Sequence, residues 1–466
     1  NFATTATKLR KSLIADDFPI TCEPALLGDK DDPRCYEVVD GVRRHISQTE
    51  LKVRELNAAL DGGKRKYNVQ DVRDLAKGYY DHVTQRTPAV VRVMTVREAI
   101  NGCEDFSGLN PINLSTSAGY PMSLYVEQGL PGKRTFLGDD GDGCMPYRLF
   151  ADELDRVTTA LSGDADAMVV FQVHNKDEKR SLAKIAAKRT RNIQAAPLSH
   201  TILMRRFFGA YLAHLKGSYS WSCSAIGMNV YSHDWQEMIE YLSLGGHEGF
   251  DGDFKKFESL FTQDLADALL HDVVEPFYKK LDPNWTPADA HMRARLMACT
   301  TGAKLLVGLW IVTQSCMNPS GTFGTSLLIN NFTAHNLLGQ VYLKLARVAA
   351  PNLANVTCFE RFVRKKIYGD DHVVVTSQKI LDFYNFTTVQ GAFADMGITY
   401  TPAEKGTVDE PACKPVTELQ FLANTTRVDD NLMSGTQLYA VPSEEAMIKP
   451  LCWTTNTEPN VDATHT

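Results

Sequence analysis

A Tyr-Gly-Asp-Asp tetrapeptide, Tyr368 to Asp371, places two adjacent carboxylates between two largely apolar runs. The runs cover 362–367 and 372–376 and are rich in β-branched and aromatic residues, as a pair of strands requires. The pattern therefore predicts a β-hairpin with Asp370 and Asp371 at its tip. Two ionised aspartates repel one another, so a fold that holds both at a tight turn favours a divalent cation, most simply the oxygen-preferring Mg²⁺. That chemistry is typical of phosphoryl transfer.

Gly-Asp-Asp is also a common turn sequence, and the chain holds an earlier copy at Gly138, Asp139 and Asp140. Its neighbours at 141–143 are Gly and Asp, and we predict no strand after them. We interpret the earlier copy as a surface turn and the later copy, flanked by strands, as the chemical site.

A third acidic element is expected, because two cations about 4 Å apart need bridging and flanking carboxylates from separate parts of a fold. The segment 252–258 supplies Asp253, at the predicted end of a strand, and Glu258, at the predicted start of a helix. An acid before a helix is also ordinary N-cap chemistry, so this segment gains its meaning from the hairpin.

The net charge of −7, taken alone, argues against a nucleic-acid partner, whose phosphates need Lys and Arg. One segment departs from that average, with seven basic residues against two acids, Asp177 and Glu178. The basic residues are Lys176, Lys179, Arg180, Lys184, Lys188, Arg189 and Arg191. Such a strip indicates a charged channel in an acidic protein; a solvated helix face is the alternative if nothing else in the chain binds phosphate.

A glycine-containing loop, 318–325, leads into a predicted helix that carries Asn330 and Asn331. Such a loop lets backbone and hydroxyl groups approach a ligand closely, although an ordinary Ser/Thr-capped helix would look the same. Asn inside a helix is costly unless its side chain bonds something.

Composition sets the class of molecule. At 466 residues with 44% hydrophobic content, the chain can form one body of several subdomains, and no linker separates its parts. The longest apolar stretch, 305–312, is too short to span a membrane, and we predict no signal peptide. The ten cysteines include no CxxC pair, which favours reduced thiols in a cytosolic setting over structural zinc.

Seven motifs follow one another between about residues 113 and 427. They are 116–121 (Thr-Ser-Ala-Gly-Tyr-Pro), 176–180 with 189–191, 253–258, 320–330, 368–371, 401–405 and 421–422. In this order the chain resembles the RNA-dependent RNA polymerases of positive-strand RNA viruses, and it is most similar to the picornavirus-like order. Each motif is modest alone, and the joint order is specific.

The resemblance implies an α+β fold shaped as a right hand and closed by fingertips, whose palm is an RRM-like antiparallel sheet with helices. We expect fingers over 1–205 with an N-terminal fingertip region, a palm over 206–420 with a fingers insertion near 275–315, and a thumb over 421–466. Only 39 residues follow Arg427, so the thumb would be short or truncated.

The resemblance also assigns roles to residues. The expected catalytic residues are Asp253, Asp370, Asp371 and Lys405. The three aspartates would hold two Mg²⁺ ions, with Mn²⁺ as an alternative, and Lys405 would protonate the leaving pyrophosphate unless it is only an exposed lysine after a turn. The expected NTP-binding residues are Lys176, Arg180, Arg189, Arg191, Glu258, Ser320, Thr325 and Asn330. The expected template and primer contacts are Ser117, Gly119, Tyr120, Gly321, Tyr368, Phe421 and Leu422.

Two departures from the family pattern affect recognition of the ribose, which would fall to Glu258, Ser320 and Asn330. The family usually has Asp where Glu258 stands, so this carboxylate reaches one methylene further. The family also spaces Thr and Asn four apart, whereas Thr325 and Asn330 are five apart, which turns Asn330 by about 100° around a helix. A one-residue insertion in the loop, with Ser326 in place of Thr325, would restore the spacing.

We therefore predict template-directed RNA synthesis from NTPs, extending an RNA or protein-linked primer to replicate a viral genome. The expected partners are template and primer RNA, NTPs, a small genome-linked protein primer and other viral replication proteins. The expected location is a replication complex in the host cytoplasm that reaches membranes through those partners. A reverse transcriptase and a catalytically silent RNA-binding scaffold are the alternatives. Gly369 and the pair Ser320 and Asn330 argue against the first, and the three carboxylates against the second.

Overall fold

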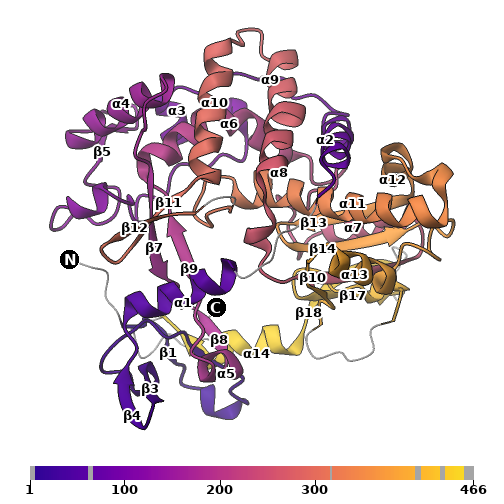
Figure 1. Ribbon diagram of the computed structural model, residues 1–466, viewed down its shortest axis with the longest axis horizontal. Helices are drawn as coiled ribbons and strands as arrows, with labels where there is room; N and C mark the ends of the chain where they lie inside the picture. Colours follow the sequence, from indigo (N-terminus) through magenta and orange to yellow (C-terminus); the bar gives the residue numbers. More distant parts are fainter. Residues whose placement is uncertain (1–5, 61–66, 315–316, 405–410, 431–435, 456–466) are drawn as a thin grey trace.

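The computed structural model describes residues 6–60, 67–314, 317–404, 411–430 and 436–455. Its helices and strands are organised around two sheets, which lie on the right and on the left of the view in Figure 1. Within the described residues, no helix is both long enough and apolar enough to span a bilayer.

The right-hand sheet has the strand order β13–β14–β10–β15, with β16 also paired to β10. Its strands are β10 (Glu248–Phe254), β13 (Val363–Tyr368), β14 (Asp371–Thr376), β15 (Tyr400–Thr401) and β16 (Lys414–Pro415). Every pair is antiparallel. The predicted hairpin is therefore confirmed as β13 and β14.

Both faces of this sheet are covered. Val374 packs in the cluster formed with α11 (Asn331–Ala349) and α13 (Phe386–Asp395), whereas Val373 and Val375 pack on the other face against α7 (Asp234–Ser243). Successive side chains of a strand point to opposite faces, so a strand buried on both sides reads as a continuous apolar run. This explains the Val-Val-Val sequence after the two aspartates.

The left-hand sheet has the order β12–β11–β7–β9, in which β11 and β7 are parallel and the other pairs antiparallel. Its strands are β7 (Val170–Asn175), β9 (Asn192–Ala195), β11 (Lys304–Val307) and β12 (Trp310–Thr313). The helices around it and along the top of Figure 1 are α1 (Gln48–Leu60), α2 (Val69–Val83), α3 (Val96–Asn101), α4 (Leu149–Ser162), α6 (Leu198–Gly217), α8 (Gln263–Ala268), α9 (Glu275–Leu281) and α10 (Pro287–Thr301).

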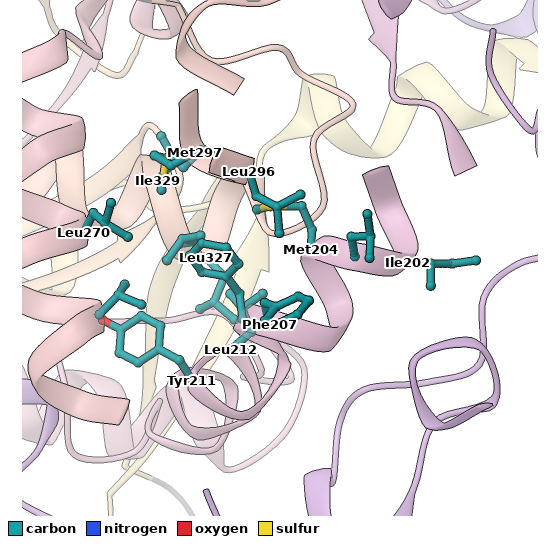
Figure 2. Packing of buried hydrophobic residues seen from close by; sticks show 14 of the residues in the cluster. Ile202, Met204, Phe207, Tyr211, Leu212, Leu270, Leu296, Met297, Leu327 and Ile329 are labelled. Carbon is teal, nitrogen blue, oxygen red and sulfur yellow. The ribbon is translucent and has the colours of Figure 1, made fainter. Parts of the chain in front are cut away.

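Helix α6 is apolar on almost every side and contributes many side chains to the largest core cluster. Figure 2 shows Phe207 and Leu212 of this helix beside Leu327, which belongs to the π-helical turn η7 (Thr325–Asn330). Burying one such side chain contributes roughly 1.5–3 kcal/mol. The turn that leads into α11 is thus embedded in the core rather than laid on the surface.

The loop before η7 meets the left-hand sheet at Gly321. Its N–H donates to the carbonyl oxygen of Gln194, at 3.1 Å, and forms an isolated bridge with Ala195 at the end of β9. A Cβ at this position would lie 2.2 Å from the Gln194 oxygen, so only glycine fits. The loop before η7 is therefore held against the strand that follows the basic strip.

The chain closes on itself between its two ends. The hairpin of β17 (Asn424–Asp429) and β18 (Gln437–Pro442) is followed by α14 (Glu444–Cys452), which runs along the bottom of Figure 1 toward β8 (Lys179–Ser181) and α5 (Leu182–Ala186). Strand β19 (Trp453–Thr454) then pairs with β1 (Arg10–Lys11). This is the closed arrangement that the resemblance leads us to expect.

The earlier Gly-Asp-Asp copy departs in part from its prediction. A strand does follow it, because β5 (Leu137–Asp139) and β6 (Cys144–Pro146) form a short hairpin. The second strand was not predicted, because the Gly-rich residues at the tip are typical of a loop. The interpretation as an exposed turn holds, since Asp140 is exposed and forms an ion pair with Arg97.

Candidate active site

The hairpin tip brings the predicted carboxylates to one edge of the right-hand sheet. Tyr368 pairs with Asp371, and Gly369 takes a positive φ of 73° in the turn between them. Gly252 of β10 pairs with His372, so the next position in the same register sets Asp253 beside Asp371. Asp370 is exposed at the tip and Asp253 is half-buried.

Asp371 is the most enclosed of these aspartates. Burial raises its pKa to about 7, and the charges of Asp370 and Asp253 add to that rise. The backbone N–H of Leu422 donates to its Oδ2 at 2.9 Å and opposes the shift. The carboxylates of Asp370 and Asp253 therefore lie close enough to Asp371 for their charges to disfavour its ionisation.

A fourth carboxylate, Asp251, escaped the sequence reasoning. It is fully buried on β10 and accepts a hydrogen bond from the backbone N–H of Gln420 at 2.8 Å. Lys414 lies 3.8 Å from the same oxygen. The only signal in the sequence is an acid two positions before Asp253, on the same side of the strand.

Within the described residues, no group of three or more His, Cys, Asp or Glu side chains is arranged so that it could hold a metal ion by itself. The carboxylates at the hairpin edge fit Mg²⁺ by their chemistry, because they are hard oxygen donors whose repulsion a cation would relieve. They form an open set that needs further oxygen ligands from outside the protein.

The basic strip is folded around one acid, Glu178. Its carboxylate accepts from Arg191 Nε at 2.6 Å, and Lys176 lies 3.2 Å and Arg180 3.9 Å away. Burial opposes ionisation of Glu178, but the hydrogen bond and charge of Arg191 lower its pKa overall. Arg189 pairs instead with Glu55 at 3.4 Å.

Arg191 connects this strip to the hairpin. Its pKa is raised, first by the hydrogen bond to Glu178 and further by the charges of Asp370 and Glu258. Glu258 lies in the short 3₁₀ helix η5 (Phe257–Leu260), open to solvent on one side but otherwise surrounded by protein, and this burial raises its pKa. The charges of Glu55 and Asp370 add to that rise.

The polar side chains in and after the loop that leads to α11 bond to different partners. Ser320 donates its hydroxyl to Gln194 Oε1 at 2.9 Å, and Asn330 accepts from Asn318 Nδ2 at 2.9 Å. The hydroxyl of Thr325 donates to the carbonyl oxygen of Thr322 at 2.8 Å and is thereby turned back into the loop. The structure therefore does not bring Thr325 to the hairpin.

Ser326 and Asn330 face the hairpin turn instead, since a Cβ on Gly369 would lie 3.9 Å from a side-chain atom of each. The expected replacement of Thr325 by Ser326 agrees with this placement. The physical reason differs from the expected loop insertion, because 325–330 form a π-helical turn with i→i+5 hydrogen bonds, which takes up the extra residue within the helix.

The loop that holds Ser117, Gly119 and Tyr120, expected to contact the template, lies against the residues after β9, since the N–H of Leu198 donates to the oxygen of Ala118 at 2.9 Å. Ser117 Oγ accepts from the backbone N–H of Gly119 at 3.1 Å, and a Cβ on Gly119 would lie 2.4 Å from the oxygen of Ala196. Tyr120 is partly exposed. The buried side chain of Lys133, which sequence reasoning missed, donates to the carbonyl oxygens of the loop.

The expected primer contacts are only partly exposed. Tyr368 is 40% exposed beside the hairpin tip, and Leu422 is partly buried. Phe421 is 1% exposed and lies against Trp235 of α7, with ring centroids 6.5 Å apart. The Phe421 ring fills the core behind the sheet, and the expected contact of this residue with template or primer stays a prediction. Lys405 lies outside the described residues.

Comparisons with known proteins agree with this geometry. The solved structure of a sicinivirus 3Dpol RNA-dependent RNA polymerase superposes with a TM-score of 0.75 at 22% identity, covering 98% of this chain and 86% of that one. The predicted right-hand α+β fold is thereby confirmed. The profile described as viral RNA-dependent RNA polymerase matches residues 21–463, and the chain belongs to that family.

Curated relatives place the chain among picornavirus-like replicases. It is 26% identical over 342 residues to the replicase polyprotein of acute bee paralysis virus, covering 72% of this chain and 18% of the polyprotein. It is 26% identical over 448 residues to the replicase polyprotein of cricket paralysis virus, covering 89% and 24%. The RNA1 polyprotein of Arabis mosaic virus is 26% identical over 330 residues, covering 70% and 14%. The chain thus spans less than a quarter of these relatives.

Proposed function

We propose that this chain is a template-directed RNA polymerase, which transfers nucleotides from NTPs to the 3′-hydroxyl of an RNA or protein-linked primer paired with an RNA template, and so replicates a viral RNA genome. One observation carries the proposal. Asp253, Asp370 and Asp371 lie at the same end of the right-hand sheet, and Arg191 lies close enough for the charge of Asp370 to raise its pKa. The proposed parts are fingers over 1–205, palm over 206–420 with a fingers insertion near 275–315, and thumb over 421–466.

The three aspartates would hold two Mg²⁺ ions, with Mn²⁺ as an alternative. When bound, such ions lower the pKa of a hydroxyl nucleophile and stabilise negative charge on phosphate oxygens. Burial and the charges of the neighbouring aspartates raise the pKa of Asp371, and a bound cation would relieve that repulsion. Asp371 is the more peripheral of the three, because one of its oxygens accepts from Leu422.

The basic residues would orient the triphosphate. Arg191 and Arg180 carry guanidinium groups whose planar forks match phosphate oxygens, and Lys176 and Arg189 add charge to the same strip. Glu178 already pairs with three of these cations, so a triphosphate would share or displace that carboxylate. Lys405 is proposed as the proton donor to pyrophosphate.

Ribose recognition would fall to Asn330, Ser326 and Glu258. The first two face the turn that carries Asp370, and Asn318 fixes the amide of Asn330. Ser320 would act through Gln194, to which its hydroxyl is bonded. An Asn330→Ala variant should lose preference for NTPs over dNTPs; an unchanged preference would remove Asn330 from this role.

The decisive experiment is extension of a labelled RNA primer on an RNA template with Mg²⁺, with NTPs and dNTPs compared. Asp370→Ala should lower the NTP rate on the order of a hundred- to a thousandfold, as when a group that stabilises transition-state charge is removed. Asp140→Ala is the matched control, because it alters the other Gly-Asp-Asp copy at an exposed tip. Equal use of dNTPs would favour a reverse transcriptase, and an Asp370→Ala variant as active as wild type would favour a binding scaffold.

Partners and location are proposed at a coarser level. Because the relatives are polyproteins, we propose that the chain works in the host cytoplasm within a replication complex that reaches membranes through other viral proteins. A small genome-linked protein would serve as primer. Transfer of UMP to a tyrosine of such a peptide, absent in Asp370→Ala, would support that step; failure of the wild type to label any peptide would count against it.

A further inference from the structure

Asn331 is a fully buried amide at the first position of α11. Its Oδ1 accepts a hydrogen bond from the backbone N–H of Gly369 at 2.8 Å, and its Nδ2 donates to Ser224 Oγ at 2.9 Å. The partners lie 38 and 107 positions away in the chain. The side chain therefore joins a helix, the hairpin turn and a third segment.

The bond to Gly369 satisfies a group that the hairpin itself does not use. Tyr368 and Asp371 are the last paired residues, so Gly369 stands in the turn between them, buried and at a φ of 73°. A buried N–H without a partner costs about 1–3 kcal/mol, so the turn is stable in this position only where an acceptor waits for it. Asn331 supplies that acceptor, and the residue that donates to it, Gly369, directly precedes Asp370 in the turn.

Ser224 extends the support along the outer strand of the hairpin. The N–H of Ala225 donates to the oxygen of Ile367 at 2.8 Å, and the N–H of Ile367 donates to the oxygen of Cys223 at 2.9 Å. The segment 223–225 thus covers the free edge of β13, and its serine hydroxyl meets Asn331. The hairpin is held at its edge and at its tip by one continuous network.

The position of Asn331 is itself fixed by the core. Leu327, Leu328 and Ile329 of η7 are buried, and Figure 2 shows Leu327 within the packing around α6. The π-helical turn ends at Asn330, so two adjacent asparagines leave the same rigid element. The side chain of Asn330 faces the hairpin turn on the side proposed to bind the nucleotide, while the side chain of Asn331 bonds the backbone of that turn.

We propose that Asn331 is a positioning residue that fixes the Gly369 turn, and with it the carboxylate of Asp370, relative to the residue that reads the ribose. This inference rests on the proposed polymerase function. If a nucleotide with the wrong sugar displaced Asn330, the adjacent Asn331 would move with it. The hydrogen bond from Gly369 to Asn331 would then shift the turn. Asn331 would then govern the rate of the chemical step more than the affinity for RNA.

The test compares Asn331→Leu with Asn336→Leu. Leucine has the same branched arrangement of side-chain heavy atoms as asparagine but lacks both hydrogen-bonding groups. Asn336 is the matched control, since it is equally buried on α11 and donates to the carbonyl oxygen of Val72 at 2.9 Å, away from the hairpin. Both variants should lose stability to a similar extent, but only Asn331→Leu should accelerate hydrogen exchange in the peptide 363–376.

The kinetic expectation is equally specific. Asn331→Leu should lower kcat on the order of tenfold, the change for a lost hydrogen bond of about 1.4 kcal/mol, and raise the Mg²⁺ concentration needed for half-maximal rate. Its Kd for primer–template RNA should stay within about twofold of wild type, because the turn bears little of the phosphate contact that dominates affinity. Asn336→Leu should keep the wild-type kcat and Mg²⁺ dependence.

Ser224→Ala keeps the inference testable if Asn331→Leu does not fold. It removes the acceptor of Nδ2 and leaves the bond to Gly369, so it should change hairpin exchange and kcat in the same direction but less. The role would be overturned if hydrogen exchange and kcat were unchanged in both Ser224→Ala and Asn331→Leu. It would also be overturned if Asn336→Leu had effects equal to those of Asn331→Leu. Hydrogen exchange does not depend on catalysis, so a wild type without polymerase activity would reject the function while leaving the anchoring measurable.

Discussion

At the scale of single residues, Glu178 illustrates how an acidic side chain holds a basic strip together. Its carboxylate lies among Lys176, Arg180 and Arg191, which would otherwise repel one another, and the proposed function places the triphosphate beside them. The pairing holds Arg191 in a bidentate orientation, with Nε at 2.6 Å. The same carboxylate competes with any incoming anion.

Glu178→Gln is therefore expected to separate affinity from rate. Removing one negative charge should strengthen inhibition by pyrophosphate about fivefold, near 1 kcal/mol for a partly exposed pair, while kcat falls because Arg191 loses its fixed orientation. Inhibition constants and kcat measured together check this, with Glu37→Gln as control because Glu37 bonds Arg44 and Arg54, which lie outside the basic strip. Weaker pyrophosphate binding would contradict the competition.

The pH dependence of this pair has a definite sign. Because Arg191 holds the pKa of Glu178 below its ordinary value of 4.5, the native state binds fewer protons there than the unfolded chain. The stability that the carboxylate contributes is present above about pH 4.5 and is lost as the pH falls through the lowered pKa. The difference in unfolding free energy between wild type and Glu178→Gln should shrink in acid.

At the scale of elements, the turn after the right-hand sheet carries unusual backbone conformations. Phe421 and Asn424 exchange two backbone hydrogen bonds of 2.9 Å, and the residues between them, Leu422 and Ala423, take φ of 50° and 58°. Turns of this shape normally hold Asn-Gly, since a side chain at positive φ costs of order 1 kcal/mol or more. Asp371 accepts the N–H of Leu422 at 2.9 Å and so fixes the turn against the hairpin.

Ala423→Gly should raise the free energy of unfolding by about 1 kcal/mol, because glycine adopts this φ without steric penalty. Gly397→Ala is the control, because it makes the opposite substitution at a similar backbone conformation. Gly397 has a φ of 73° with nothing within 4 Å of an added Cβ, so only backbone strain changes. Urea denaturation of both variants should move in opposite directions. Destabilisation by Ala423→Gly would mean that the alanine methyl makes contacts worth more than the strain.

The same elements show what the sequence could and could not predict. The β-branched flanks of Tyr368 to Asp371 were sufficient for the hairpin, because strand pairing there follows from local pattern. The spacing of Thr325 and Asn330 indicated an extra residue but not its location, since a π-helical turn depends on the surrounding core. The burial of Phe421 was not predicted, because an apolar residue in a motif looks the same whether it packs inward or meets a ligand.

Contacts between distant segments were the least accessible to prediction. Nothing in the sequence states that Asn331 meets Gly369 or that Asp251 meets Gln420, because these bonds depend on how helices and sheets pack. The one usable signal was the cost of an unpartnered Asn in a helix, which requires a bonding partner without saying which. Family order supplied the remaining assignments.

At the scale of the whole molecule, the two ends of the described chain close the hand. Strand β19 pairs with β1, the N–H of Ser12 donates to the oxygen of Cys452 at 3.1 Å, and Trp453 Nε1 donates to the oxygen of Cys22 at 2.9 Å. Helix α14 also accepts from Lys179 of the basic strip, through the oxygen of Lys449 at 3.2 Å. The pairing of the two ends and the basic strip therefore share elements.

Trp453→Ala should weaken that closure, since it removes both the indole packing and the hydrogen bond to Cys22. An open hand holds RNA less long, so the lifetime of a stalled elongation complex should shorten roughly tenfold, the effect of losing about 1.4 kcal/mol, while the rate of the first nucleotide addition changes little. Trp310→Ala is the matched control, because Trp310 is 73% exposed on β12 and takes no part in the pairing of β1 with β19. Challenge with heparin after one addition measures the lifetime in each variant. A lifetime equal to wild type in Trp453→Ala would show that the fingers and the palm retain RNA without closure, whereas equal losses in both variants would indicate a general effect of removing tryptophan.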